Sequence, residues 1–154
     1  MSDGEGKGLP RLRRVITGIN EDGRSCILFD GPAEPVIWSA PELPVDNSGT
    51  QDMGLGRFRF PTSGVDFNFA NLPPGGEPFM HATNTIDFVV VVSGEIVFIT
   101  ETGEVALRAG DVLVDRGIVH AWRNDSDQTC RIVCVMCPAH PVGAGANFPD
   151  HIDL

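Results

Sequence analysis

Two of the four histidines and one nearby aspartate have the residue types and spacing best suited to chemistry. His81 precedes Asp87 by six positions, and His120 lies in a second segment that runs from Gly117 to Asn124. Two imidazoles and one carboxylate, directed inward from rigid strands, would form a facial set of ligands for a divalent metal with open positions. We therefore expect His81, Asp87 and His120 to bind a metal. The same residues leave a second arrangement open, in which no metal is tightly bound and Asp87 acts as an acid or base beside His120.

Three neighbouring side chains are expected to line a substrate pocket. On an extended backbone, residues two apart point to the same side, so Phe79 and Thr83 share a face with His81. By the same rule Trp122 shares a face with His120. The Thr83 hydroxyl could hydrogen-bond a bound water, while Phe79 and Trp122 would supply aromatic walls.

Each of these side chains also has a purely structural interpretation. His81 could be a core histidine that is hydrogen-bonded to a carbonyl group, and Asp87 could cap a turn. Trp122 could fill the core as readily as it could line a pocket.

Short strands must position these residues, because the dominant period of the sequence is two. Val65–Ala70 alternates strictly, which places Phe67 and Phe69 on one face, and we expect both in the core. Short apolar runs separated by turn signals indicate an all-β sandwich or barrel with little helix. The segment from Pro35 to Arg57 is rich in turn residues and is expected to be an irregular loop. Strands are expected at Ser25–Phe29, Val65–Ala70, Phe88–Val92, Ile96–Thr100, Val105–Leu107, Val112–Val114, around His120–Trp122 and at Arg131–Cys137.

The run Phe88–Val92 is apolar at every position instead of alternating. A strand of this kind needs cover on both of its faces. The cover could come from a second sheet or from another subunit, so the run favours a homodimer.

At this point the sequence resembles the cupin superfamily, whose members are small β-barrels with two conserved motifs. The first motif, G-x5-H-x-H-x3,4-E-x6-G, keeps every spacing here, with Thr83 in place of the second histidine and Asp87 in place of the glutamate. The second motif, G-x5-P-x-G-x2-H-x3-N, is one residue shorter here and has Asp115 at the proline position. The matching residues are Gly75, His81, Thr83, Asp87 and Gly94 in the first motif, and Gly110, Asp115, Gly117, His120 and Asn124 in the second.

The resemblance covers roughly residues 58–138 and implies a double-stranded β-helix, the jelly-roll barrel of this family. It also implies a divalent metal such as Fe, Mn, Ni or Zn. The replaced residues bear on that metal, because the Asp87 carboxylate reaches about 1.5 Å less far than a glutamate. A metal shifted toward Asp87, a water in the gap, and no tightly bound metal are all open.

Length and composition are those of one globular domain. The chain has 154 residues, of which 42% are hydrophobic and 21% charged, which argues against disorder. We expect a single barrel domain over residues 10–142, with flexible tails at 1–9 and 143–154. The net charge of −10 would be repelled by nucleic acid and by anionic membranes, so a small molecule is the expected partner.

The expected location is the cytoplasm. The first residues, MSDGEGKGLP, lack the apolar stretch of a secretory signal. No apolar run approaches the ~20 residues that span a bilayer. The four cysteines are then expected to be reduced, buried and inert.

For function, the resemblance implies a metal-dependent enzyme that acts on a small oxygen-bearing molecule. A lyase, decarboxylase or isomerase is favoured over a dioxygenase, because Thr83 replaces a motif histidine. A non-catalytic barrel that binds or senses a small ligand is the alternative from another class, and a barrel whose site has decayed is a third.

Overall fold

The structure, a computed structural model, describes residues 8–146. Ten strands and no helix occur within these residues, so none of them forms a helix that could cross a membrane. The strands are β1 (Arg13–Ile19), β2 (Ser25–Pro32), β3 (Val36–Ala40), β4 (Val65–Leu72), β5 (Thr85–Ser93), β6 (Glu95–Thr100), β7 (Glu104–Arg108), β8 (Val112–Asp115), β9 (His120–Arg123) and β10 (Cys130–Pro138).

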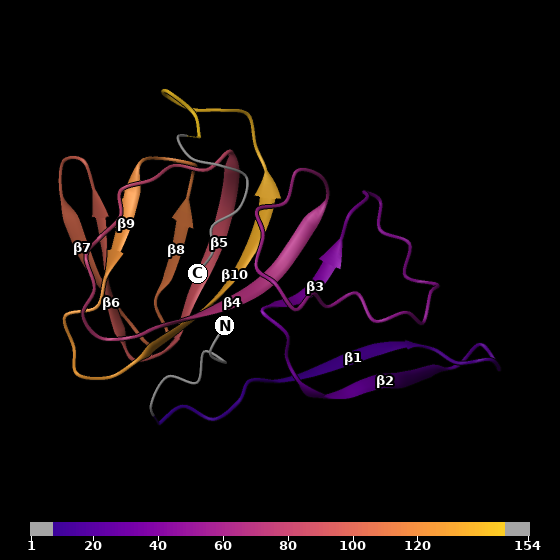
Figure 1. Cartoon of the computed structure of the whole chain (residues 1–154). Coiled ribbons are helices and arrows are strands. Elements are labelled where there is room, and N and C mark those ends of the chain that lie inside the picture. Colours follow the sequence, from indigo (N-terminus) through magenta and orange to yellow (C-terminus); the bar gives the residue numbers. More distant parts are fainter. Residues whose placement is uncertain (1–7, 147–154) are drawn as a thin grey trace.

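Two antiparallel sheets face each other and enclose the core (Figure 1). The larger sheet has five strands in the order β3-β4-β10-β5-β8, and the smaller has three in the order β7-β6-β9. Consecutive strands β5 and β6 belong to different sheets, and Gly94 between them has a φ of 78°, which suits glycine at such a corner. The all-β, double-stranded β-helix expected from the sequence is confirmed.

The apolar core lies between the two sheets and reaches His120, on which its member Phe98 stacks. Its buried members share inward positions on four strands, chiefly on β5, β6 and β10. They are Val89, Val91, Ile96, Phe98, Leu107, Cys130, Ile132, Cys134 and Met136.

Strand β4 turns its polar residues inward. Asp66 and Asn68 are 0% and 2% exposed, whereas Phe67 between them is 39% exposed. The sequence-based prediction that Phe67 and Phe69 belong to the core was therefore wrong for Phe67, and Phe69 is only partly buried. The physical reason is that Arg59 donates two hydrogen bonds to the Asp66 carboxylate. These bonds offset the cost of burying a charged group at an inward position.

Strand β5 alternates in burial although its sequence does not alternate in polarity. Val89 and Val91 point into the core, whereas Phe88, Val90 and Val92 point outward and stay 38–46% exposed. The second sheet thus covers one face of this strand only.

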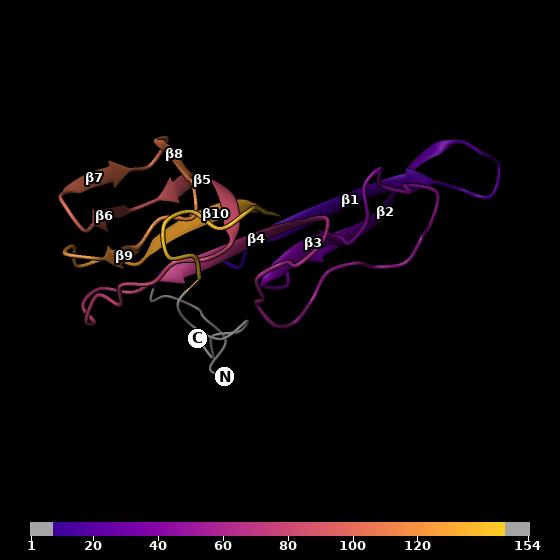
Figure 2. The same ribbon diagram turned by 90° about the horizontal axis from the view of Figure 1, so that it is seen from above.

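The first 57 residues hold the largest departures from expectation. The segment 35–57 is not wholly irregular, because β3 lies within it and pairs with β4. Strands β1 and β2 form a separate hairpin that projects away from the two sheets (Figure 2). Of the two expected tails, residues 1–7 and 147–154 lie outside the described part of the chain, and the single-domain boundaries remain a prediction.

Candidate functional site

The two motif histidines face each other across an isolated pair of backbone hydrogen bonds. The His81 N–H donates to the His120 carbonyl at 2.9 Å, and the His120 N–H donates to the His81 carbonyl at 2.8 Å. Directly opposed residues of an antiparallel pair have their side chains on one face. The two ring centroids are accordingly 4.4 Å apart.

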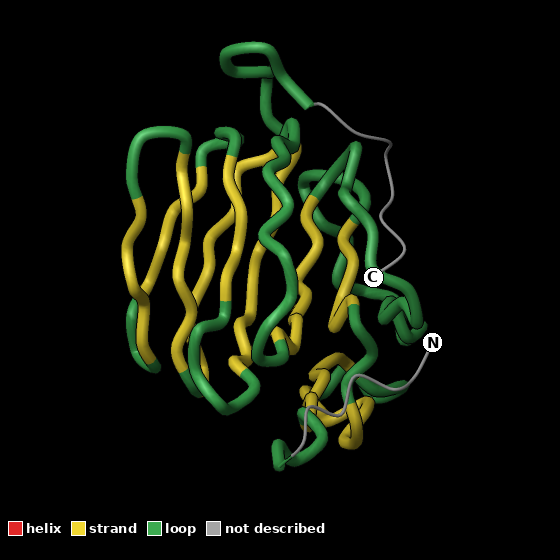
Figure 3. The backbone as a smooth tube through the Cα atoms, turned by 60° about the vertical axis from the view of Figure 1, so that its left-hand side comes forward, coloured by secondary structure: helices red, strands yellow, loops and turns green. Residues whose placement is uncertain are grey.

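A second bridge holds the same two segments together. The Gly75 N–H donates to the Asn124 carbonyl at 3.1 Å, so the first glycine of one motif meets the asparagine of the other. The Asn124 side chain donates to the Leu72 and Gln128 carbonyls and is 3% exposed. The segment after β4 is thereby fixed along β9, next to the smaller sheet. Figure 3 shows this long loop running beside the strands.

Both imidazoles are oriented through Nδ1. His81 Nδ1 lies 2.7 Å from the Phe79 carbonyl and His120 Nδ1 lies 2.8 Å from the Ile118 carbonyl. Because a carbonyl oxygen only accepts, Nδ1 carries the proton in each ring and Nε2 carries the lone pair of the neutral form. Burial, helped by the neighbouring His120, lowers the pKa of His81, so this ring stays neutral at pH 7.

The carboxylate of Asp115 lies beside the Nδ1 atom of His120. Its Oδ2 atom lies 3.1 Å from His120 Nδ1, and the two side chains are 1% and 4% exposed. The Nδ1–H is aimed at the Ile118 carbonyl, so Oδ2 itself has no hydrogen-bond partner among the described residues. Oδ1 accepts from the Gly117 N–H at 3.1 Å, which fixes the carboxylate. A buried carboxylate oxygen is costly unless a positive charge develops beside it, and His120 is the group that can carry one.

Asp87 ends a chain of three hydroxyl and carboxyl groups. The Thr85 hydroxyl donates to Asp87 Oδ1 at 2.7 Å, and the Thr83 hydroxyl is 2.8 Å from that of Thr85. All three side chains are buried. Burial raises the pKa of Asp87 to about 7, the Thr85 hydrogen bond opposes this, and Asp115 adds to it. Asp87 is therefore partly protonated near neutral pH.

The three expected metal ligands do not assemble. Over residues 8–146, no three side chains of His, Cys, Asp or Glu come together as a group that could hold a metal ion. His81 and His120 meet, but the Asp87 carboxylate is bonded to Thr85, and its charged neighbour is Asp115. The chain's own donors thus do not fit the facial triad expected from the sequence.

Aromatic side chains surround the imidazole pair. Phe79 stacks on His81 at 5.6 Å between centroids and is 61% exposed, so it marks the side that faces solvent. Phe98 stacks on His120 at 5.1 Å, and Trp122 meets His120 edge to face at 6.2 Å. Trp122 also packs against the core, as its structural interpretation expects, and its role as a pocket wall stays a prediction.

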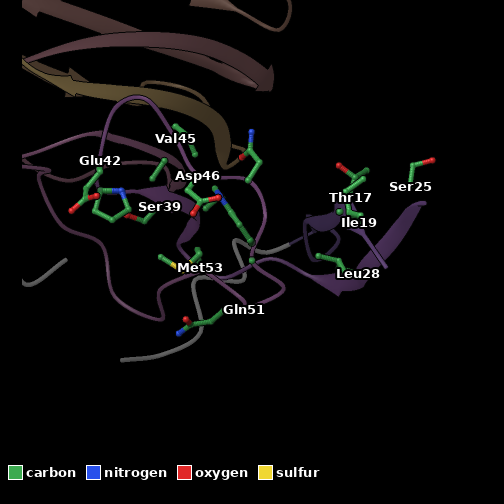
Figure 4. A pocket seen from close by; sticks show the side chains of 16 residues that line it. Thr17, Ile19, Ser25, Leu28, Ser39, Glu42, Val45, Asp46, Gln51 and Met53 are labelled. Carbon is green, nitrogen blue, oxygen red and sulfur yellow. The ribbon is translucent and has the colours of Figure 1, made fainter. Parts of the chain in front are cut away.

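Two cavities bear on where a small molecule could bind. A cavity of about 250 Å³ borders the hydroxyl chain, is lined by Thr83 and Thr85 together with Phe60 and Pro138, and does not include either imidazole in its lining. A cavity of about 600 Å³ lies between the hairpin and the loop after β3, with Leu28 and Ile19 on one side and Glu42 and Val45 on the other (Figure 4). The larger cavity is remote in the fold from the histidines and shares no residue with them.

Two residues of this site were missed by reasoning from the sequence. Asp115 was noted only as a departure from the motif proline, although a carboxylate five positions before a histidine, across a glycine turn, is a signal for a supporting acid. Thr85 carried no signal beyond its spacing, two positions after Thr83 and two before Asp87. The cysteines also differ from expectation, since Cys130 and Cys134 are buried but Cys26 and Cys137 are only partly so.

Comparison with known proteins settles the family. The family described as "Cupin domain" matches residues 68–136. The chain is 30% identical to the cupin-domain-containing oxidoreductase srdD of Neurospora crassa, with 76% of this chain and 68% of that protein covered. The chain belongs to the cupin superfamily.

This cupin covers very different shares of its other relatives. It is 33% identical to the oryzines biosynthesis cluster protein J of Aspergillus oryzae, with 88% of each chain covered. It spans only 45%, 43% and 58% of three further curated relatives. Among solved structures, a protein with a double-stranded β-helix domain from Klebsiella pneumoniae is 26% identical over 49% of this chain and 68% of its own, with a TM-score of 0.44.

Proposed function

We propose that this cupin is a small-molecule enzyme that moves a proton at the His120–Asp115 pair, as a lyase, decarboxylase or isomerase would. The observation that carries the proposal is the 3.1 Å approach of Asp115 Oδ2 to His120 Nδ1 inside the sandwich. In this role His120 Nε2 accepts a proton from the substrate, and Asp115 stabilises the imidazolium that forms. General acid–base catalysis of this kind contributes about 10²–10⁴-fold to a rate.

His81 and Asp87 have supporting roles in the proposal. Neutral His81, in ring contact with His120, can accept a hydrogen bond at Nε2 from a hydroxyl group of the substrate and so position the substrate beside His120. Asp87 can return a proton, since its pKa of about 7 leaves both of its forms populated near neutral pH. Thr85 and Thr83 connect Asp87 to the cavity of about 250 Å³.

A divalent metal is not needed for these steps. If one binds, the two imidazoles are the protein ligands that the geometry offers, and water or substrate oxygens must complete the coordination. The proposal also includes a cytoplasmic setting, supported by four cysteines that remain free thiols, and a homodimer, supported by the uncovered outer side of β5.

The test is deuterium exchange followed by NMR in D₂O, with a panel of small hydroxy- and keto-acids. Wild-type protein is expected to introduce deuterium at a carbon next to a carbonyl group in at least one compound. His120→Gln is expected to lower that rate by at least about 100-fold. If compounds bind to the wild-type protein without exchange or conversion, the non-catalytic ligand-binding alternative is favoured instead.

Redox chemistry is a second candidate, favoured by the similarity to relatives such as the cupin-domain-containing oxidoreductase srdD. Oxygen uptake measured on the same panel separates it from proton transfer. Oxygen consumption that matches the loss of substrate would support a redox reaction. Deuterium exchange without oxygen uptake would support the proton-transfer proposal.

A further inference from the structure

The cavity of about 600 Å³ between the β1–β2 hairpin and the loop after β3 takes no part in the chemistry proposed for His120. We call it the hairpin cavity. Its volume lies within the roughly 300–1,000 Å³ of sites that bind small molecules. Residues 41–64 join β3 to β4 without a helix or strand of their own. Loops longer than about 12–15 residues are uncommon in compact domains and usually serve a function when they are ordered.

The loop is fastened at both of its ends. Gly64, just before β4, has a φ of 68°, and a Cβ there would overlap the Ala40 carbonyl oxygen at the end of β3. Only glycine therefore lets the two ends of the loop meet. The Ser39 N–H donates to the Met53 carbonyl at 3.0 Å, which joins the returning part of the loop to β3. The loop wall of the hairpin cavity is thus formed before any ligand arrives.

Arg14 ties the hairpin to the same loop. Its guanidinium pairs with both oxygens of Asp52 and also donates to the Ile37 carbonyl at 3.0 Å. The Arg14 side chain is only 9% exposed. A Cβ at Gly54 would lie 2.5 Å from Arg14 Nη1, so the glycine makes room for the guanidinium. The two walls of the hairpin cavity are thereby held at a fixed separation.

The walls themselves are largely apolar. Ile19 and Leu28 contribute from the hairpin, Trp38 from β3, and Val45 and Met53 from the loop. Ile19 and Val45 are 46% and 40% exposed, so part of this apolar surface is open to water. A carbon skeleton that covered it would gain about 25 cal/mol for each Å² removed from water.

The charge of the lining is purely negative. None of the 16 lining residues is Lys, Arg or His, whereas Glu42 and Asp46 are acidic. Asp46 lies near the middle of the lining and Glu42 at its edge (Figure 4). The Ser48 hydroxyl and N–H donate to Asp46 Oδ1 at 2.6 and 2.9 Å and lower the pKa of Asp46, so this carboxylate is ionised at neutral pH. Both bonds use Oδ1, and Oδ2 is left to meet a ligand.

We propose that the hairpin cavity binds a small organic cation, an amine or quaternary ammonium compound with an aliphatic or aromatic body. The charged group meets the Asp46 carboxylate and the Trp38 indole, since a cation is attracted to both. The carbon skeleton lies between Leu28 and Val45. This site shares no residue with the His120 site, so the inference is independent of the proposed function.

Other classes of small ligand fit less well. An anion would meet no basic side chain in the lining, and the net charge of −10 would repel it. For a metal ion, the part of the chain from 8 to 146 brings no three His, Cys, Asp or Glu side chains together, here or elsewhere. The apolar walls would also gain nothing from a bare ion.

The experiment is a titration of the labelled full chain with phenethylammonium, followed by two-dimensional proton–nitrogen NMR. The chain has two tryptophans, and each gives its own indole N–H signal. Trp38 lines the hairpin cavity, whereas Trp122 lies beside His120. Trp38→Phe assigns the two signals. Phenethyl alcohol has the same shape without the charge, and hydrocinnamate carries the opposite charge. Dispersed backbone signals establish that each variant is folded.

Phenethylammonium is expected to shift the Trp38 signal to saturation and to leave the Trp122 signal in place. Phenethyl alcohol is expected to bind about 10-fold more weakly, and hydrocinnamate to cause no shift. Asp46→Asn keeps an acceptor for Ser48 but loses the charge, and should raise the dissociation constant of phenethylammonium about 10-fold. Glu101→Gln is the matched control, because Glu101 is an exposed carboxylate between β6 and β7, and it should bind as wild type does.

Four results would overturn the inference. A shift of Trp122 without Trp38 would place the probe inside the barrel. Equal affinity for phenethylammonium and phenethyl alcohol, or unchanged affinity in Asp46→Asn, would show that the cavity does not select a cation. A Trp38 signal that moves when the protein alone is diluted would mean that a second copy of the chain fills the cavity. None of these results bears on deuterium exchange at His120, which is measured separately.

Discussion

Asp87 and Asp115 lie opposite each other on the adjacent strands β5 and β8, and both are buried within the sandwich. Like charges at directly opposed positions of a sheet are destabilising. Burial and the field of Asp115 raise the pKa of Asp87 to about 7, so one of the two carboxyl groups retains its proton up to neutral pH. Because Asp115 also lies beside His120, the same buried region holds a group that can donate a proton, Asp87, and a group that can accept one, His120.

The first prediction concerns stability against pH. In the unfolded chain the pKa of Asp87 returns to its ordinary value of 3.8, whereas in the folded state it is about 7. Between these values the folded state binds more protons, so the free energy of unfolding falls as the pH rises from about 4 to 7 and then levels off. The contribution of this one group is at most about 4 kcal/mol.

Asp87→Asn keeps the acceptor for Thr85 but removes the titration. Urea unfolding of this variant at several pH values is expected to show a flatter profile than wild type and higher stability at pH 8. Asp127→Asn, at an exposed position, is the control and should reproduce the wild-type slope. An Asp87→Asn profile that parallels wild type would show that the carboxyl group is ionised throughout the range.

The second prediction concerns the turn that supports His120. Gly117 has a φ of 74°, and a Cβ there would lie 2.8 Å from the Thr83 carbonyl oxygen. Gly117→Ala is therefore expected to destabilise the protein by about 2 kcal/mol or more, through backbone strain and the clash. Gly103→Ala is the control, since a Cβ at Gly103 meets nothing within 4 Å. Equal unfolding midpoints for the two variants would refute the assigned constraint.

The third prediction concerns metals. Because the described side chains bring together only two of the three expected ligands, protein purified without added metal is expected to carry Fe, Mn, Ni or Zn well below one equivalent. Prolonged chelation should leave both the thermal midpoint and the exchange rate unchanged. Metal at one equivalent that is lost in both His81→Ala and His120→Ala would instead establish a two-histidine metal centre.

The motif spacing predicted the meeting of the two histidines because it encodes backbone geometry. Gly75 and His81 on one segment pair with Asn124 and His120 on the other, so spacing and register describe the same bridge. The direction of the Asp87 carboxylate could not be predicted in this way. It depends on the hydroxyl of Thr85, a contact between side chains that no spacing rule contains.

The fold class followed from the period of two, but the choice of face did not. Val65–Ala70 alternates, and hydrophobicity alone places Phe67 inward. The structure reverses this because Asp66 and Asn68 face a polar interior, where Arg59 donates to Asp66. Strand β1 was missed for a related reason: its sequence, RRVITGI, does not alternate between apolar and polar residues, although its burial alternates along the strand.

The most direct test of the central claim is a double-mutant cycle on the rate of deuterium exchange. If Asp115 acts by stabilising the imidazolium of His120, Asp115→Asn should lower the wild-type rate by about 10- to 100-fold and have almost no effect in a His120→Gln background. The same fold-loss in both backgrounds would mean that Asp115 acts independently of His120 and would contradict the proposed mechanism.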